Sequence, residues 1–389
     1  MKYKSLFRLT FWKSVALIIV ATGLYSTYFR IVDGLGAVTN LNDAFPWGLW
    51  IGFDILCGVG LAAGGFTICA ITHIFNLEKF KPLARPAILT AFLGYVLVIF
   101  ALMFDLGRPY NIWHALIMWN PHSVMFEVAW CVMLYTTVLF LEFSPIILER
   151  FKLKKIHSFL KKYLIPIMIL GIILSTLHQS SLGSLYLIIP QKMHPLWYSS
   201  LLPIYFYLSA IGVGFAMVVF EAYLSARAFN HGLKLDLLSS IAKVTFAVLI
   251  ISFIIRLFDL TISGKLNYLI TPSYETYMFY LEIIVGTFVP VALLGNSRIR
   301  TSRLGLYISA IFVIAGFLLN RLNVSVTSLT SYAGYAYFPS VSEISITLMI
   351  VVLGMWAFSL IVKNFPVFAE PHEIKNEVPV SSGNIILSE

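Results

Sequence analysis

Acidic side chains interrupt the long apolar stretches of this 389-residue sequence, where they are costly to bury. They are Asp54, Asp105, Glu127, Glu221 and Glu282. An ionisable group near the centre of a lipid bilayer costs roughly 2.5–3.5 kcal/mol or more, so it indicates function by default. A carboxyl group in such surroundings can take up and release a proton. These residues therefore point to proton chemistry inside a membrane.

Two acids have a basic residue at helical spacing, which gives them a purely structural alternative. Arg108 lies three residues after Asp105, and Arg256 lies three residues before Asp259. Residues three positions apart are neighbours on a helix and can form an ion pair. Either pair could therefore neutralise itself without any further role.

Glu127 and Glu282 lack such a partner, because no basic residue lies within one helical turn of either. We expect both to be buried carboxyl groups that carry protons. Tyr95 lies in the middle of an apolar stretch and, with Arg85 and Glu221, would extend a proton route toward the cytoplasm. The structural alternative for Tyr95 is a hydrogen-bonded aromatic residue of the core.

A polar cluster, His178-Gln179-Ser180-Ser181, ends another apolar stretch and is followed by Ser184. Its imidazole, amide and hydroxyl groups suit a ligand that carries carbonyl or hydroxyl oxygens on an apolar ring. The alternative is that these groups cap helix ends beside an interfacial belt of aromatic residues.

Cysteine and histidine usage argues against metal centres. Cys57, Cys69 and Cys131 all fall in apolar stretches without a Cys-x-x-Cys pair, so we expect no iron–sulfur cluster and no zinc site. A membrane haem typically needs two histidines that face each other at one depth, and the eight histidines do not offer this arrangement. We expect no haem, although His178 with a loop histidine would be an alternative ligand pair.

The elements that must position these residues are membrane-spanning helices. About 20 apolar residues in helical form cross a bilayer, because unpaired backbone groups are not tolerated there. The mean hydropathy of +0.87 and the 12% of charged residues fit this class. We predict an all-α integral membrane protein, a single membrane domain over residues 1–389, with about ten transmembrane helices. They are expected near 14–32, 48–75, 86–106, 123–149, 162–182, 202–228, 239–262, 275–296, 303–322 and 343–363.

An internal repeat organises these helices. Gly58-x-Gly60 and Asp105 recur as Gly212-x-Gly214 and Asp259, with 47 residues between glycine and acid in both copies. We therefore predict two four-helix bundles plus flanking helices. The expected division is given by these ranges: 1–47, an anchor helix and outer loop; 48–185, the first bundle; 202–322, the second bundle; 343–363, the last helix; 364–389, a cytoplasmic tail.

The distribution of positive charge predicts the orientation. On the expected topology, 21 of the 27 Lys and Arg residues lie on the face that carries both termini. Cytoplasmic loops are enriched in these residues, so both termini are predicted to be cytoplasmic. The same bias accounts for the net charge of +9 without a nucleic-acid partner.

Several motifs resemble one known family closely. The segments 34–54, 104–109 (Phe-Asp-Leu-Gly-Arg-Pro), 177–184 (Leu-His-Gln-Ser-Ser-Leu-Gly-Ser) and 194–197 (His-Pro-Leu-Trp) resemble the HybB-type membrane subunit of nickel–iron hydrogenases. That subunit belongs to the polysulfide reductase NrfD family. The resemblance covers roughly residues 33–365.

The resemblance implies a haem-free, quinone-reactive subunit of the bacterial inner membrane, with menaquinone as the expected substrate. Such subunits exchange electrons with a periplasmic ferredoxin-like iron–sulfur subunit, which is fed by a catalytic subunit such as nickel–iron hydrogenase. The chain alone is expected to have no activity.

The resemblance also assigns roles to single residues. The quinone pocket would be lined by His178, Gln179, Ser180, Asp54, Asp105 and Arg108, and protons would move through Glu127, Tyr95, Arg85, Glu221 and Glu282. A secondary transporter is the alternative, since such proteins also combine repeated bundles with buried acids. The parallel repeats and the gathering of polar groups toward one face favour the quinone-reactive subunit.

Overall fold

Helices account for all the regular secondary structure in the computed structural model, which describes residues 10–229 and 232–368. Apolar residues that face lipid cannot leave backbone N–H and C=O groups unpaired, and a helix pairs them within one segment. Within the described residues there is no strand. The predicted all-α class is therefore confirmed.

Among the described residues, ten helical segments are long and apolar enough to cross a bilayer, as predicted. Their bounds are Phe11–Val32, Trp50–Ile74, Glu78–Asp105, Val124–Arg150, Lys154–Ile188, Leu202–Phe229, Leu235–Ile262, Tyr274–Gly295, Arg303–Ala333 and Val341–Asn364.

Uninterrupted α-helices form most of these spans. They are α1 (Phe11–Val32), α4 (Lys81–Asp105), α6 (Val124–Arg150), α7 (Lys154–Ser184), α8 (Leu202–Phe229), α9 (Leu235–Ile262), α14 (Arg303–Ser325) and α16 (Val341–Asn364). The span between α9 and α14 combines α11 (Tyr274–Ile283), the π-helix η6 (Ile284–Phe288) and α12 (Val289–Gly295).

Short helices complete the connections and span ends. They are α5 (His114–Ile117), α10 (Asn267–Ile270), α13 (Ser297–Arg300), α15 (Thr330–Ala333) and the 3-10 turns η3 (Glu78–Phe80), η4 (Pro109–Asn111), η5 (Leu185–Ile188) and η7 (Thr327–Leu329).

The second span is irregular and central. It consists of the π-helices η1 (Trp50–Ile55) and η2 (Ala70–Ile74) on either side of α2 (Leu56–Leu61) and α3 (Gly64–Cys69). It is more buried than the other described spans. Small residues allow this close packing, because a Cβ atom on Gly214 of α8 would lie 2.8 Å from the Ala63 backbone.

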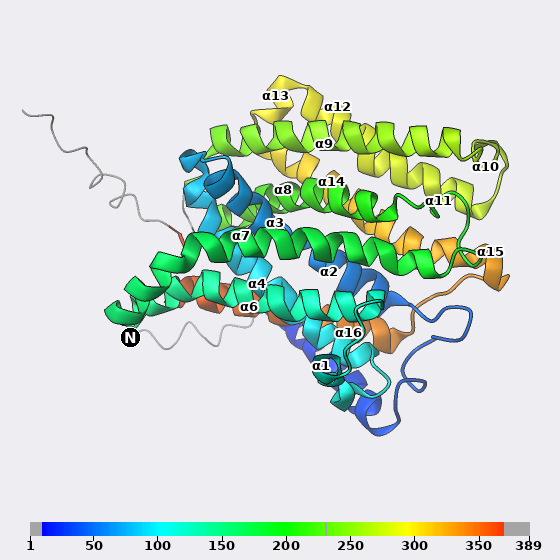
Figure 1. Cartoon of the computed structure of the whole chain (residues 1–389), viewed down its shortest axis with the longest axis horizontal. Coiled ribbons are helices and arrows are strands. Elements are labelled where there is room, and N and C mark those ends of the chain that lie inside the picture. The colour runs from blue at the N-terminus through cyan, green and yellow to red at the C-terminus, as the bar shows by residue number, and fades with distance from the viewer. Residues whose placement is uncertain (1–9, 230–231, 369–389) are drawn as a thin grey trace, which may run out of the picture.

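The long helices lie side by side in Figure 1, with loops gathered at two ends. Helices α10 and α15 lie at one end and α13 at the other. Neighbouring contacts join α6 to α7, α7 to α8, α8 to α9 and α1 to α16. Because α7 and α3 both pack on α8, the two predicted bundles share an interface, and their boundary stays a prediction.

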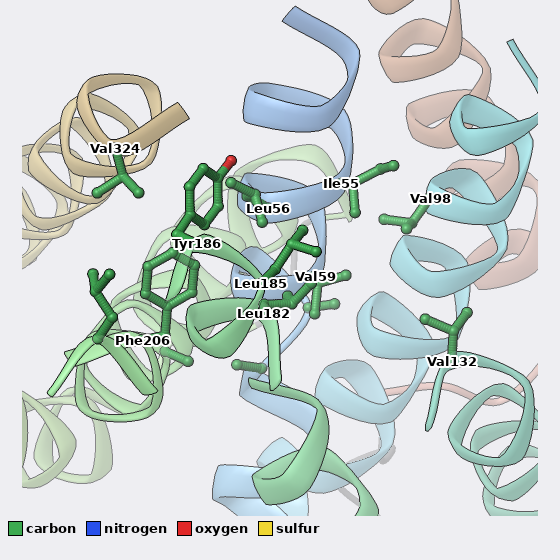
Figure 2. Packing of buried hydrophobic residues seen from close by; sticks show 14 of the residues in the cluster. Ile55, Leu56, Val59, Val98, Val132, Leu182, Leu185, Tyr186, Phe206 and Val324 are labelled. Atoms are coloured by element: carbon green, nitrogen blue, oxygen red, sulfur yellow. The ribbon is translucent and has the colours of Figure 1, made fainter. Parts of the chain in front are cut away.

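Apolar side chains from α2, η5, α8 and α14 pack together in the core, at the interface between the two predicted bundles. Figure 2 shows Tyr186 and Phe206 beside Leu56 and Val324. The Tyr186 and Phe206 ring centroids are 6.2 Å apart. Lipid is as apolar as these side chains, so close packing holds the helices together.

Candidate functional site

His178 points into the first predicted bundle from α7 and is fully buried, with 0% of its surface exposed. The Tyr95 ring of α4 lies 5.7 Å from its imidazole, centroid to centroid. Tyr135 of α6 meets Tyr95 edge-on at 4.7 Å. Ser175, one turn before His178 on α7, lies beside both phenol groups. We call these four residues the His178 cluster.

The polar atoms of the His178 cluster lack hydrogen-bond partners outside the cluster among the described residues. Both imidazole nitrogens of His178 are without one, and the hydroxyl groups of Tyr95, Tyr135 and Ser175 have only one another as hydrogen-bonding neighbours. A buried polar group without a partner costs about 1–3 kcal/mol, so native proteins rarely keep several together. The cluster therefore has the capacity to bind water or a ligand with oxygen atoms.

Gln179 and Ser180 follow His178 in the chain but point elsewhere. The Gln179 amide donates to the Val59 carbonyl at 3.2 Å, and Ser180 donates to the carbonyl of Thr176 at 2.9 Å. Successive residues of a helix are separated by about 100°, because one turn takes 3.6 residues. Of the three predicted residues, only His178 has its side chain in the cluster.

Glu127 lies in the first turn of α6, whose N-terminus is capped by Ser123. Its side chain is exposed, so the expectation of a buried carboxyl was wrong. The reason is its place at the end of the helix, where few neighbours surround it. The carboxylate accepts a hydrogen bond of 2.5 Å from Ser181, which lies three residues after His178 on α7. Glu127 thus connects this end of the spans to the neighbourhood of the His178 cluster.

Asp54, which is buried, and Asp105, which is half-buried, lie at the same end of the spans as Glu127. Asp54 accepts a hydrogen bond of 2.7 Å from Thr347 of α16, and one oxygen of Asp105 is buried without a partner. Arg30 of α1 donates to the carbonyls of Phe104 and Leu106 on either side of Asp105, at 2.7 and 2.6 Å.

The alternative ion pair between Asp105 and Arg108 was wrong. Helix α4 ends at Asp105, and Leu106 adopts an extended conformation, so helical spacing does not continue. Arg108 is exposed and forms no ion pair with a described residue.

Arg85 and Glu221 lie toward the end of the spans opposite Glu127 and do not contact the His178 cluster directly. Arg85 pairs with Glu149 of α6 at 3.2 Å. Glu221 of α8 accepts a hydrogen bond of 2.5 Å from Thr90, while its second oxygen is buried without a partner among the described residues. Thr90 is five residues from Tyr95 on α4, roughly 7.5 Å along the axis.

Glu282 is buried, as expected, but it has a basic partner from another helix. Arg256 of α9 pairs with it at 2.5 Å, so the alternative pair of Arg256 with Asp259 was also wrong. Trp197, Asn320 and Asn323 each donate a further hydrogen bond of 2.8 Å to the Glu282 carboxylate. Four donors therefore surround this group.

The segment around His194 connects the two predicted bundles, between η5 and α8. Its Nδ1 accepts a hydrogen bond of 3.3 Å from the backbone of Leu196. Partial burial lowers the pKa of His194, and the nearby Glu275 carboxylate opposes this shift. The neutral ring that results keeps Nδ1 free to accept that bond.

Sequence reasoning missed several buried polar residues. Glu142 lies on α6 seven residues after Tyr135 and is 6% exposed. Its spacing places it on the same helix face as Tyr135 and Glu149, a pattern that could have identified it. Arg321 is 1% exposed and stacks on Phe206 at 3.6 Å. It stands at the end of an apolar stretch, where a basic side chain usually reaches water, so its burial was not predictable from the sequence.

Two cavities lie in the second predicted bundle, with volumes of about 100 and 20 Å³. Neither is lined by His178 or by the other predicted pocket residues. No group of three or more potential metal ligands occurs among the described residues. His231 and His372 lie outside them.

Comparisons with known proteins agree with this architecture. The sequence profile of the family described as polysulphide reductase, NrfD matches residues 37–333. A protein of Nitratidesulfovibrio vulgaris is 39% identical over 92% of this chain and 95% of its own length. The probable Ni/Fe-hydrogenase 2 b-type cytochrome subunit of Escherichia coli is 36% identical over 87% of each chain. The integral membrane subunit of the N. vulgaris menaquinone reductase is 28% identical over 96% of this chain and 95% of its own.

Proposed function

This chain belongs to the polysulphide reductase NrfD family, and we propose that it is the quinone-reactive membrane subunit of a respiratory oxidoreductase in the bacterial inner membrane. Menaquinone is the proposed substrate, and nickel–iron hydrogenase is the proposed catalytic partner. The names of two relatives, a menaquinone reductase subunit and a hydrogenase subunit, support this choice. A periplasmic iron–sulfur subunit would pass electrons between the hydrogenase and this chain.

The observation that carries this proposal is the buried imidazole of His178, whose two nitrogens lack hydrogen-bond partners among the described residues. A quinone ring presents two carbonyl oxygens, and each must gain a proton when the ring is reduced. Imidazole N–H and phenol O–H groups can donate hydrogen bonds to such oxygens. Aromatic neighbours such as Tyr95 also offer the apolar contact that a ring needs.

The proposed reaction adds two electrons and two protons to the quinone, so that two O–H bonds form and the ring becomes a quinol. The electrons come from the iron–sulfur partner at the outer face, and the reverse reaction returns them. The side chains of this chain hold the ring and move the protons. Asp54, Asp105 and Arg108 would support the outer wall of the pocket.

Glu127 is the proposed proton donor on the outer side, because its hydrogen bond to Ser181 leads toward His178. Tyr95 would connect the cluster inward, toward Glu221 and Arg85. If protons come from the cytoplasm, each charge moved works against about 2.3 kcal/mol per 100 mV of membrane potential. The four donors around Glu282 favour a structural role for that residue.

We also propose that the chain works without haem. His178 offers an imidazole, but its close ring neighbour is Tyr95, and the other described histidines lie outside the spans or near their cytoplasmic ends. The expected donor set of two facing histidines is therefore missing from the described residues. The purified chain should show no b-type absorbance bands, and a haem spectrum at one haem per chain would overturn this part.

Substitution of His178 tests the quinone site. His178→Ala should reduce hydrogen-dependent menaquinone turnover by roughly a hundredfold, the loss typical of a proton-transfer group. Glu127→Gln should give a smaller loss. Electron transfer from the partner subunits to a soluble dye should remain, because it bypasses this chain.

The matched control is His122→Ala, which changes an exposed histidine in an outer loop. This variant should retain menaquinone turnover. Full turnover by both His178→Ala and Glu127→Gln, with the complex assembled, would remove these residues from the mechanism. Co-purification with identification of the bound subunits tests the proposed hydrogenase partner separately.

A further inference from the structure

Helix α7 has about ten more residues than a crossing of the bilayer needs. It contains 31 residues, Lys154–Ser184, whereas about 20 apolar residues in helical form suffice. Its buried residues begin only at Met168, and four of its first nine residues are lysines. A lysine within the hydrocarbon is costly, so the extra length lies at the Lys154 end, at the membrane surface. In Figure 1 this end of α7 and the adjoining end of α6 project beyond the neighbouring helices.

The surface part of α7, residues 154–163, has two distinct faces. Successive residues of a helix are about 100° apart around its axis, so Ile156, Phe159 and Tyr163 fall within an arc of about 60°. The lysines fall within an arc of about 120° on another side of the helix. They are Lys154, Lys155, Lys161 and Lys162. An apolar face beside a basic face is typical of a segment at a membrane interface.

The apolar face is not covered by the described part of the protein. The side chains of Ile156, Phe159 and Tyr163 are between 44% and 66% exposed. Phe151 and Leu153, in the turn that precedes α7, are also exposed. Apolar side chains that gather on an exposed surface need a partner that is itself apolar. At the membrane surface, the acyl chains of lipids are such a partner.

The positive charge of this region is not balanced by the described part of the protein. Residues 150–163 contain six basic side chains and no acidic one. All six residues are exposed, and none forms an ion pair with a described residue. The nearest acid in the sequence, Glu149, already pairs with Arg85 at 3.2 Å and contacts His157 at 3.7 Å. The region therefore attracts an anion from outside the chain.

We propose that residues 150–163, which we call the α7 surface segment, bind anionic phospholipids. The lysines contact the headgroup phosphates, while Ile156, Phe159 and Tyr163 contact the acyl chains of the same lipids. Basic clusters beside a membrane span attract anionic lipids in this way. A soluble anion would leave the apolar face uncovered, whereas a phospholipid matches both faces. The site does not depend on the quinone function proposed above.

Photolabelling of the purified complex in phosphatidylcholine vesicles tests the proposal. The probes are two phospholipids with a photoreactive diazirine group, one a phosphatidylglycerol and the other a phosphatidylcholine, each used at the same low fraction. Labelled peptides are identified by mass spectrometry. In the wild type, the α7 surface segment should take up roughly tenfold more label from phosphatidylglycerol than from phosphatidylcholine. Raising the salt concentration to about 1 M, where the Debye length is about 3 Å, should reduce this preference severalfold.

A variant without the four lysines should lose most of this preference. It combines Lys154→Gln, Lys155→Gln, Lys161→Gln and Lys162→Gln. The matched control removes the same charge from other loops at the same end of the spans, all at exposed positions. It combines Lys79→Gln, Lys234→Gln, Arg298→Gln and Arg303→Gln, and it should keep the preference. If the first variant does not assemble, the salt dependence of the wild type still tests the proposal.

Four results would each overturn the proposal. Equal labelling by the two lipids in the wild type would show that the segment does not select anionic lipid. An equal loss of preference in both variants would reflect the general charge of this end of the protein. Displacement of the label by soluble glycerol 3-phosphate would identify a soluble anion as the occupant. Absence of label from the α7 surface segment in the assembled complex would mean that a partner subunit covers it.

The His178→Ala variant separates this proposal from the proposed quinone site. Its α7 surface segment should be labelled as in the wild type, even where menaquinone turnover is lost.

Discussion

His178 and Glu282 give the same signal in the sequence, a polar side chain within an apolar stretch, but their surroundings differ. Both nitrogens of His178 lack partners among the described residues, whereas Glu282 accepts four hydrogen bonds. A saturated carboxylate holds helices together, and an unsatisfied imidazole can receive a ligand. The residue type indicates a polar site, and the hydrogen-bond partners of the residue decide whether that site is structural or binds a ligand.

Glu282→Ala should destabilise the protein strongly. It leaves the Arg256 charge partly buried without its carboxylate, and breaking a buried ion pair in this way typically costs about 3–5 kcal/mol. Unfolding in mixed detergent micelles measures the change. Glu78→Gln is the control, because it disrupts an exposed ion pair with Lys81 and should leave the unfolding midpoint unchanged. Equal effects of the two substitutions would contradict the structural role of Glu282.

At the scale of elements, close approach of helices depends on a few glycines. Helix α14 meets η6 where Gly316 faces Gly286, and a Cβ atom on Gly316 would lie 1.9 Å from the Gly286 Cα. Real Cβ atoms do not approach a backbone atom so closely, so the two segments would have to move apart. In lipid, where packing and not the hydrophobic effect joins helices, such a shift directly weakens their association.

Gly316→Ala should therefore lower the thermal stability of the protein and reduce the yield of assembled complex. Gly107→Ala is matched to it, because no atom lies within 4 Å of the added methyl group there. The midpoint of thermal aggregation in detergent reports the difference. If Gly316→Ala behaved like Gly107→Ala, the close contact of α14 with η6 would not contribute to stability.

At the scale of the whole molecule, the helices place their loops at two ends (Figure 1). On the predicted topology, 21 of the 27 Lys and Arg residues lie on one of these two sides. An excess of Lys and Arg in short loops marks the cytoplasmic side. On this orientation Glu127 and Asp105 face the periplasm, which is where the proposed iron–sulfur partner would dock.

Cysteine labelling tests this orientation. Cys57, Cys69 and Cys131 are buried, so the unmodified protein should react little. In intact spheroplasts, Asn267→Cys should react with a membrane-impermeant maleimide, whereas Lys155→Cys should react only after lysis. Both residues are exposed in the structure, so the two positions are matched in their accessibility to the reagent. The opposite pattern would invert the topology and place the proposed quinone site near the cytoplasm.

The spans and the family were predictable from the sequence because both are recognised from short segments of consecutive residues. A membrane-crossing helix satisfies its own backbone, so an apolar run of sufficient length identifies it without knowledge of its neighbours. The ten spans agree with the predicted ranges to within a few residues, with three exceptions. The third begins eight residues earlier, at Glu78, the fifth begins earlier and continues through η5, and the ninth continues through α15. His178 was also found in this way, as a polar residue at the end of such a run.

The partners of the polar residues were decided only by the tertiary structure. Arg256 pairs with Glu282, which lies 26 residues away, and Asp54 bonds to Thr347, which lies 293 residues away. Helical spacing pointed instead to pairs within one helix, at Asp105 and Arg256. Interactions between helices depend on how each helix is rotated and which neighbour it meets, and a single sequence does not record either. The larger cavity in the second bundle exists for the same reason, since four separate segments enclose it.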